Sequence, residues 1–186
     1  MKKRIIYKEI NTRRLCLRQF RDKDFDAYAT IMVDPEIGKW FPKGTGFSYQ
    51  EAEKSFNSIR EHWTRHGFGI WAVFHKKQTI LIGRCGLNLI DETSEVEIDF
   101  LLAKKFWGKG YATEAAKAVL AYGFNILNLD RIIALAKIEN IASRKVMEKI
   151  GMHYIKNAQY WRISCAYYDL TKADYMHELS KPKEVY

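Results

Sequence analysis

The sequence predicts a single domain of the mixed α/β class, built around one sheet. Its 186 residues suffice for a sizeable core, and a content of 47% hydrophobic and 28% charged residues is typical of a globular protein. Predicted strands are mixed with helices and the hairpins come first, which favours a mixed sheet over a doubly wound parallel one. We find no repeat, low-complexity segment or linker, so residues 1–186 are predicted to form one domain.

The first part of the chain combines one strand with two helices. Residues 14–20 alternate well enough to predict a strand. Apolar residues at helical spacing follow, and the "DP" pair at 34–35 should stop this helix. The stretch "KWFPKGTGF" is expected to be a loop with exposed aromatic residues. Ser48 and Glu51 form a capping-box pattern for a second helix, which should end near Gly67.

The middle of the chain is rich in strands. "FGIWAVFH" and "TILIGRCGLNLI" predict a hairpin that turns at "KKQ". The next segment, "SEVEIDFLLA", alternates strictly between two faces, which predicts a strand with one apolar and one acidic face. The apolar face carries Val96, Ile98, Phe100 and Leu102, and the acidic face carries Glu95, Glu97 and Asp99.

The last third alternates helices with strands. An apolar stripe that starts at Tyr111 predicts a long helix, and "RIIALAKI" predicts a buried strand. A further helix should begin at Asn140 and end just before Gly151, because asparagine caps helix starts and glycine follows helix ends. The tail predicts one or two strands and a short helix.

The net charge of +9 is concentrated at the start of the chain. Residues 1–23 hold nine basic and two acidic residues. Such a segment could bind a polyanion, such as RNA, a ribosome surface or a phosphorylated cofactor, or it could be a solubilising tail beside a charged strand.

Cysteine usage and hydropathy predict a cytoplasmic location. Cys16, Cys85 and Cys165 are far apart and odd in number, which favours free buried thiols in a reducing compartment over disulfides or a zinc site. Lys8 and Glu9 interrupt any apolar signal segment, and no apolar run approaches the roughly 18 residues that span a membrane. We therefore expect neither a secretion signal nor a membrane span.

Two glycines lie at the mouth of a predicted helix in "FWGKGYATEA", residues 106–115. The first amides of a helix have no internal partner, and the helix dipole adds partial positive charge there. Glycine lets a phosphate approach the backbone closely, and neighbouring lysines add charge. The stretch therefore predicts an anion cradle for a group such as a pyrophosphate, although a plain strand-to-helix turn would use the same residues. It matches neither the Walker loop nor G-x-G-x-x-G.

This stretch resembles the cofactor loop of the GCN5-related N-acetyltransferase (GNAT) superfamily, whose pattern is Gln/Arg-x-x-Gly-x-Gly/Ala. Trp107 takes its first position, as is usual in the branch that acetylates ribosomal-protein N-termini (RimJ/RimL-like), and Gly110 and Ala112 take the small ones. Four other blocks match this branch in order and spacing, over roughly residues 11–175. They are "TRRLCLRQFRDKDF", "DPEI", "EVEIDFLL" and "NLDRIIALAKIENIASRKVMEKIGM".

The resemblance implies a mixed seven-stranded sheet with four main helices, in which two central strands splay apart to admit the pantetheine arm of acetyl-CoA. It implies that the backbone amides of residues 108–113 hold the pyrophosphate and that the strand near Leu101 and Leu102 pairs with the pantetheine. The implied cofactor-binding residues are Leu101, Leu102, Trp107, Gly108, Lys109, Gly110, Tyr111, Ala112, Thr113, Asn140 and Ser143.

Acetyl transfer needs a base, because a protonated amine cannot attack a thioester. Glu97 is the candidate: it lies on the acidic strand face and at the position that matches the superfamily's strand-borne glutamate. Clustered carboxylates raise one another's pKa, although the same pattern would also suit a solvated face. The family usually has glycine at Asp99, which leaves open the shape of the acceptor site and which acid does the work.

The general acid is less clear in this sequence. Met147 fills the position at which a tyrosine often serves in the superfamily, and methionine cannot donate a proton. By resemblance Ser143 becomes the candidate donor to the thiolate, with a bound water as the alternative, and Asn140 touches the cofactor besides capping its helix. His62 and His66 lie four residues apart, but Trp63 replaces the glutamate of H-E-x-x-H, so no metal site is expected.

The resemblance therefore predicts an acetyl-CoA-dependent enzyme that transfers acetyl directly to an amine. A protein N-terminal α-amine is the first candidate, and a polyamine, an aminoglycoside or another small amine is the second. A non-catalytic module that senses acyl-CoA or binds RNA or the ribosome is the rival. Trp40 and Phe41 are candidates for a substrate wall, and a monomer or a homodimer is expected.

Overall fold

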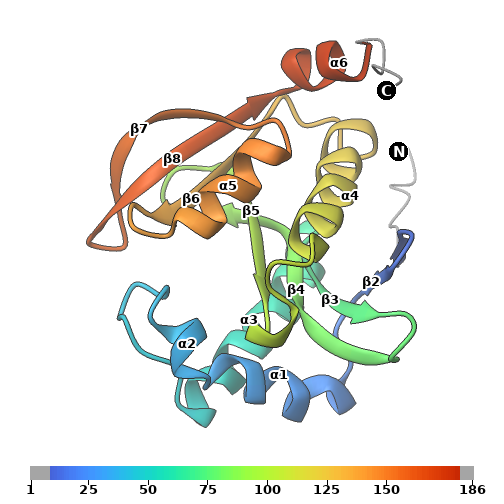
Figure 1. The fold of residues 1–186 in the computed structure, drawn as a ribbon, viewed down its shortest axis with the longest axis vertical. Helices are drawn as coiled ribbons and strands as arrows, with labels where there is room; N and C mark the ends of the chain where they lie inside the picture. Colours follow the sequence, from blue (N-terminus) through green and yellow to red (C-terminus); the bar gives the residue numbers. More distant parts are fainter. Residues whose placement is uncertain (1–8, 181–186) are drawn as a thin grey trace.

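The computed structural model describes residues 9–180 and places eight strands in one sheet, in the order β1-β2-β3-β4-β5-β6-β8-β7 (Figure 1). Residues 1–8 of the basic N-terminal segment lie outside the described part. The strands are β1 (Glu9–Asn11), β2 (Leu15–Arg18), β3 (Ile70–His75), β4 (Ile80–Ile90), β5 (Glu95–Leu102), β6 (Arg131–Lys137), β7 (His153–Tyr160) and β8 (Ile163–Thr171).

Six α-helices and two short 3-10 helices accompany these strands in residues 9–180. The α-helices are α1 (Phe25–Met32), α2 (Pro35–Gly38), α3 (Tyr49–His66), α4 (Tyr111–Asn125), α5 (Ile141–Lys149) and α6 (Lys172–Ser180), and the 3-10 helices are η1 (Asp22–Asp24) and η2 (Lys104–Phe106). The predicted mixed α/β class is confirmed. The counts differ from the expected seven strands and four main helices because β1 adds an edge strand and because α2 and α6 are short extra helices.

The sheet is divided between β5 and β6. These two strands are parallel, and their pairing is confined to Glu97 and Ile133. In contrast, β5 pairs with β4 along its whole length, and β6 pairs with β8 along its whole length. Beyond Glu97, the edge of β5 that faces β6 therefore makes no backbone pairs with β6. The expected splay of the two central strands is present.

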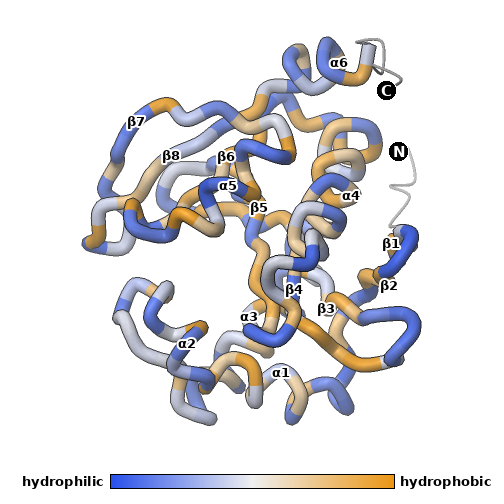
Figure 2. Tube along the Cα trace, viewed as in Figure 1, coloured by the Kyte–Doolittle hydropathy of each residue, from blue (hydrophilic) through white to orange (hydrophobic). Residues whose placement is uncertain are grey.

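Helices cover both faces of the first half of the sheet. The side chain of Arg84 on β4 reaches Tyr28 of α1 and Ser55 of α3 on one face. Leu87, three residues further along β4, lies beneath Gly123 of α4 on the other face. The hydrophobic core lies between these layers, and the central strands of the trace are among its hydrophobic segments (Figure 2). A smaller cluster of Ile90, Ile133 and Tyr167 joins β4, β6 and β8, and Ala158 and Tyr160 of β7 pack against it.

Local sequence signals fix both ends of α3. The capping box of α3 is confirmed, since Ser48 and Glu51 each accept a backbone hydrogen bond from the other, and Gly67 ends this helix at a φ of 73°. The loop predicted at residues 39–47 is confirmed, and the short helix α2 precedes it. Its aromatic residues are not exposed as expected, because Phe41 is buried against Phe47 with ring centroids 4.5 Å apart.

Two of the predicted buried thiols are confirmed: Cys85 and Cys165 are buried and free, whereas Cys16 is half-buried and free. Within the described part of the chain, no helix has both the length and the apolar character that crossing a membrane requires.

Gly86 is a position where the sheet leaves no room for a side chain. A Cβ there would lie 2.3 Å from Ile70 Cα and 2.4 Å from Gly69 O, and neither backbone atom can move without shifting β3. We expect Gly86→Ala to lower the free energy of unfolding by about 2 kcal/mol or more, measured by urea denaturation. Gly67→Ala is the control, because its Cβ would meet no atom within 4 Å and only the positive φ costs about 1 kcal/mol. Equal losses in the two variants would contradict this packing.

Candidate active site

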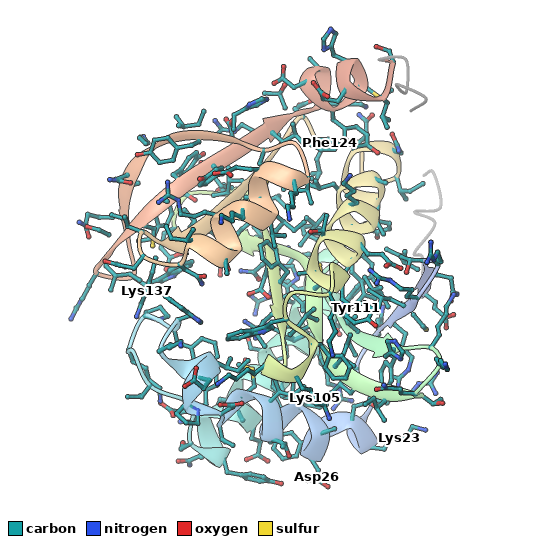
Figure 3. The ribbon with its side chains drawn as sticks, in the orientation of Figure 1. Lys23, Asp26, Lys105, Tyr111, Phe124 and Lys137 are labelled. Carbon is teal, nitrogen blue, oxygen red and sulfur yellow. The ribbon has the colours of Figure 1, made fainter. Side chains whose placement is uncertain are left out.

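A cleft of about 710 Å³ opens where β5 and β6 diverge, and it gathers almost all of the predicted site residues. Figure 3 shows two of its lining residues, Tyr111 at the start of α4 and Lys137 at the end of β6. Lys109 is the one predicted residue that does not line it, because its ammonium group turns to Lys105 O at 2.8 Å. The predicted residues that line the cleft are Glu97, Leu101, Leu102, Trp107, Gly108, Gly110, Tyr111, Ala112, Thr113, Asn140 and Ser143.

The glycine loop forms one end of this cleft. Gly108 and Gly110 adopt φ values of 72° and 76°, which side chains disfavour, and a Cβ on Gly108 would meet no atom within 4 Å. Gly110 caps α4 without a side-chain bond, so the first amides of the helix remain available. Trp107 closes the loop onto the sheet, since its indole N–H donates to Leu102 O at 2.6 Å. The loop therefore fits an anionic group such as a pyrophosphate.

Arg14, which precedes β2, is hydrogen-bonded to this loop and to the first turn of α4. Its backbone N–H and its Nε donate to Glu114 at 2.8 and 2.6 Å, and its Nη1 donates to Lys109 O at 3.0 Å. Its guanidinium also lies 4.3 Å from the centre of the Tyr111 ring. Arg14 therefore neutralises the carboxylate in the first turn of α4 while it fixes the loop. The sequence analysis did not single out Arg14, because its partners lie about 100 residues away.

Glu95, the first carboxylate of β5, is held by a network of its own. Tyr160 and Tyr167 donate their hydroxyl groups to it at 2.7 Å each, and Arg131 donates at 3.1 Å. Burial opposes ionisation, but these donors outweigh it and keep the pKa of Glu95 below its ordinary value. The pKa of Tyr160 rises to about 12 through burial and this contact. Glu95 is thus ionised at neutral pH.

Asp99 is paired with Arg84, a residue that the sequence analysis missed. The guanidinium donates to both carboxylate oxygens at 2.9 Å each, and it also donates to the Tyr28 hydroxyl at 3.0 Å. The Coulombic attraction of Asp99 keeps the pKa of Arg84 above its ordinary value in spite of burial. A single arginine in the apolar run "ILIGRCGL" was the signal that could have identified a partner for Asp99.

Glu97 lies between these two networks and has neither of their partners. Its side chain is only 8% exposed, so the alternative of a solvated strand face is wrong. Burial is the largest effect on its carboxyl group and the negative charge of Asp99 is the next, whereas Arg84 and a hydrogen bond from the Leu135 backbone oppose them. Together they raise the pKa of Glu97 to about 8. At neutral pH this group can both accept and release a proton.

The start of α5 lies across the cleft from β5. Asn140 caps this helix, because its Oδ1 accepts the Ser143 backbone N–H at 3.1 Å, and both residues line the cleft. Met147 lines it too and is buried. Asn140 therefore has the structural role that its sequence context predicted, at a position where it can also contact a bound molecule.

His62 has a structural role that its sequence context did not predict. Its Nε2 accepts the Leu89 backbone N–H at 3.0 Å, so its Nδ1 donates to Phe68 O at 2.9 Å, and burial lowers its pKa. The ring is thus a neutral tie between α3 and β4. Among residues 9–180, no three histidine, cysteine, aspartate or glutamate side chains are grouped as a metal site requires.

Comparisons with known proteins agree with this geometry. The family model described as "Acetyltransferase (GNAT) domain" matches residues 14–153. A Bacillus subtilis protein named "Uncharacterized N-acetyltransferase YnaD" is 35% identical over 77% of this chain and 81% of its own length.

Solved structures give the same result. The structure of a GNAT-family acetyltransferase from Bacillus anthracis matches with a TM-score of 0.77 and 29% identity, over 89% of this chain and 99% of that one. RimL, a ribosomal L7/L12 α-N-protein acetyltransferase in complex with coenzyme A, shares the fold with a TM-score of 0.73 at 16% identity, over 88% and 97% of the two chains. The chain therefore belongs to the GNAT family of N-acetyltransferases, enzymes that take their acetyl group from acetyl-CoA.

Proposed function

We propose that this enzyme acetylates the α-amine at the N-terminus of a peptide or protein, with Glu97 as the base. The observation that carries the proposal is the buried carboxyl of Glu97, whose pKa of about 8 stands alone between two neutralised acids. An α-amine has an ordinary pKa of about 7.7–8.0, so a proton passes between the two groups at little cost in free energy. An alkyl amine with a pKa near 10.4 would hold its proton more tightly.

The paired state of Glu95 and Asp99 argues against polycationic acceptors. A polyamine or an aminoglycoside carries several ammonium groups, and each needs a carboxylate or another acceptor when water is excluded. Glu95 is engaged by Tyr160, Tyr167 and Arg131, and Asp99 by Arg84. RimL, which shares the fold, is named for the same α-amine chemistry.

Acetyl-CoA would lie along the splayed edge of β5. The amides of residues 108–113 would hold its pyrophosphate, and the free edge near Leu101 and Leu102 would pair with the pantetheine arm. A bound acetyl-CoA supplies the activated acetyl group. A backbone N–H of β5 would donate to the thioester oxygen, where negative charge develops.

Glu97 would act on the attacking amine and Ser143 on the departing thiolate. Glu97 would accept the proton of the acceptor amine as the new amide bond forms. Ser143 would donate a hydrogen bond to the departing thiolate from the start of α5, since Met147 offers no proton. The buried cleft would hold both reactants in line, which favours direct transfer.

Glu97→Gln removes the base but keeps the shape of the side chain. We expect kcat for a peptide acceptor to fall by about 10²- to 10⁴-fold, measured as coenzyme A release and as peptide mass. A reagent blank is required because the chain has three thiols.

The fold of this variant can be checked independently. Because the pKa of Glu97 is raised, ionisation of Glu97 destabilises the native state progressively as the pH rises from about 4.5 to 8. The glutamine variant should therefore unfold at a temperature at least as high as the wild type at pH 9. Full activity in this variant would remove Glu97 from the mechanism.

Asp99→Asn tests the electrostatic origin of the raised pKa. The variant removes the negative charge that raises the pKa of Glu97, and it keeps the positive charge of Arg84 that lowers this pKa. Because peptide α-amines titrate in the same range, the carboxyl carbon of Glu97 should be followed by NMR in the free protein. We expect its midpoint to move below 8.

Glu95→Gln is the matched control, since Glu95 is two residues from Glu97 on the same strand and does not contribute to its pKa. A midpoint that stays unchanged in Asp99→Asn, or moves equally in Glu95→Gln, would contradict this assignment.

Arg14→Ala should weaken acetyl-CoA binding more than the chemical step. The loss of its hydrogen bonds frees the loop and leaves Glu114 unneutralised beside the pyrophosphate. We expect the KM for acetyl-CoA to rise about tenfold with kcat changed less than threefold. Arg14→Ala/Glu114→Gln should recover part of the loss, and Arg13→Ala, the exposed neighbour, should behave as the wild type. A fall in kcat alone would contradict this role.

A further inference from the structure

The half of the cleft on the α1–α3 side of β5 has an apolar, largely aromatic wall. Its residues come from α2, from the loop that follows α2 and from α3, and three of them, Ile37, Phe41 and Ile59, belong to the buried core. The wall is therefore firmly packed rather than adaptable. It consists of Ile37, Trp40, Phe41, Phe47 and Ile59, which we call the apolar wall.

Two charged groups beside the apolar wall, Arg84 and Asp99, are already paired with each other. The Arg84 guanidinium donates hydrogen bonds to Asp99 and to the Tyr28 hydroxyl. This hydroxyl is also hydrogen-bonded to Ser55 Oγ at 2.8 Å. A carboxylate on an acceptor would thus find no free guanidinium to clamp it in this half of the cleft. Glu97 remains as the group that can engage an amine.

The wall is held in place from the other half of the sheet. Lys137, at the end of β6, donates from its ammonium group to Lys39 O at 2.9 Å, which ties the loop after α2 across the cleft. The turn between β7 and β8 adds Trp161, which lines the same cleft and is 47% exposed. Trp161 and Arg162 form the whole turn and both have positive φ values, of 49° and 65°, as a two-residue hairpin turn requires.

We propose that the apolar wall selects the first residue of the acceptor, so that the enzyme prefers N-termini that begin with a large apolar residue such as leucine, methionine or phenylalanine. This inference rests on the proposed function, since it names the acceptor of the same site. With the α-amine at Glu97, the side chain of the first residue would lie against the apolar wall and the peptide would leave past Trp161. The peptide amide that follows needs no clamp, whereas a free carboxylate would be desolvated without a bidentate partner.

The size of the effect follows from the apolar contact. A misfit of one methylene group in an apolar pocket changes kcat/KM by roughly 10- to 200-fold. Serine or alanine at the first position would leave the apolar wall uncovered. We therefore expect kcat/KM for Leu-Ala-Ala-Ala amide to exceed that for Ser-Ala-Ala-Ala amide at least tenfold, and leucinamide to be acetylated faster than free leucine.

Trp40→Ala tests the assignment to the apolar wall. Trp40 is half-exposed, so the variant should fold, and kcat/KM for the leucine peptide should fall about tenfold while that for the serine peptide changes less than threefold. Tyr49→Ala is the matched control: Tyr49 is a 58% exposed aromatic residue on α3 that does not line the cleft, and its loss should change neither value.

Equal or better acetylation of the serine peptide would overturn the selectivity while the proposed function stands. Binding of acetyl-CoA without turnover of any peptide would overturn both. A tenfold loss with the leucine peptide in Tyr49→Ala would show that the effect does not arise at the apolar wall.

Discussion

The rest of the site depends on the single point at which β5 meets β6. The strand pairing of β5 with β6 is confined to Glu97 and Ile133, and the strands diverge beyond this pair. The divergence frees one edge of β5 for a ligand and opens the cleft at the glycine loop. It also leaves Glu97 at the point where the strands part, with its side chain buried. Burial of this carboxyl is the main cause of its high pKa.

The three carboxylates of β5 show how a shared strand face can yield separate chemistry. Glu95 meets two tyrosines and an arginine, Asp99 meets Arg84, and Glu97 meets neither set. The donors around Glu95 keep its pKa below the ordinary value, whereas burial and the charge of Asp99 raise the pKa of Glu97. Pushing the pKa values of adjacent acids apart in this way is how a fold assigns one of them to proton transfer.

Local patterns predicted much of this site. The alternation of "EVEIDFLL" placed Glu97 on the face that lines the cleft, and the two glycines before an apolar stripe placed the loop at the start of α4, because both signals lie within a few residues. The alternation could not distinguish a buried acidic face from a solvated one, since the covering helices come from elsewhere in the chain. Arg84 with Asp99, and Arg14 with Glu114, are pairs 15 and 100 residues apart, and the spacing of residues carries no signal for such contacts. Phe41 was expected to be exposed for the same reason.

In the proposed mechanism, the apolar wall and the base are coupled, because Glu97 and the wall line the same cleft. The pKa of Glu97 depends first on its burial. A wider or more polar wall would admit water and let Glu97 ionise more easily, which would make it a weaker base. The contacts that would select an acceptor are thus the same ones that match the base to its amine. In this architecture, selectivity and basicity change together.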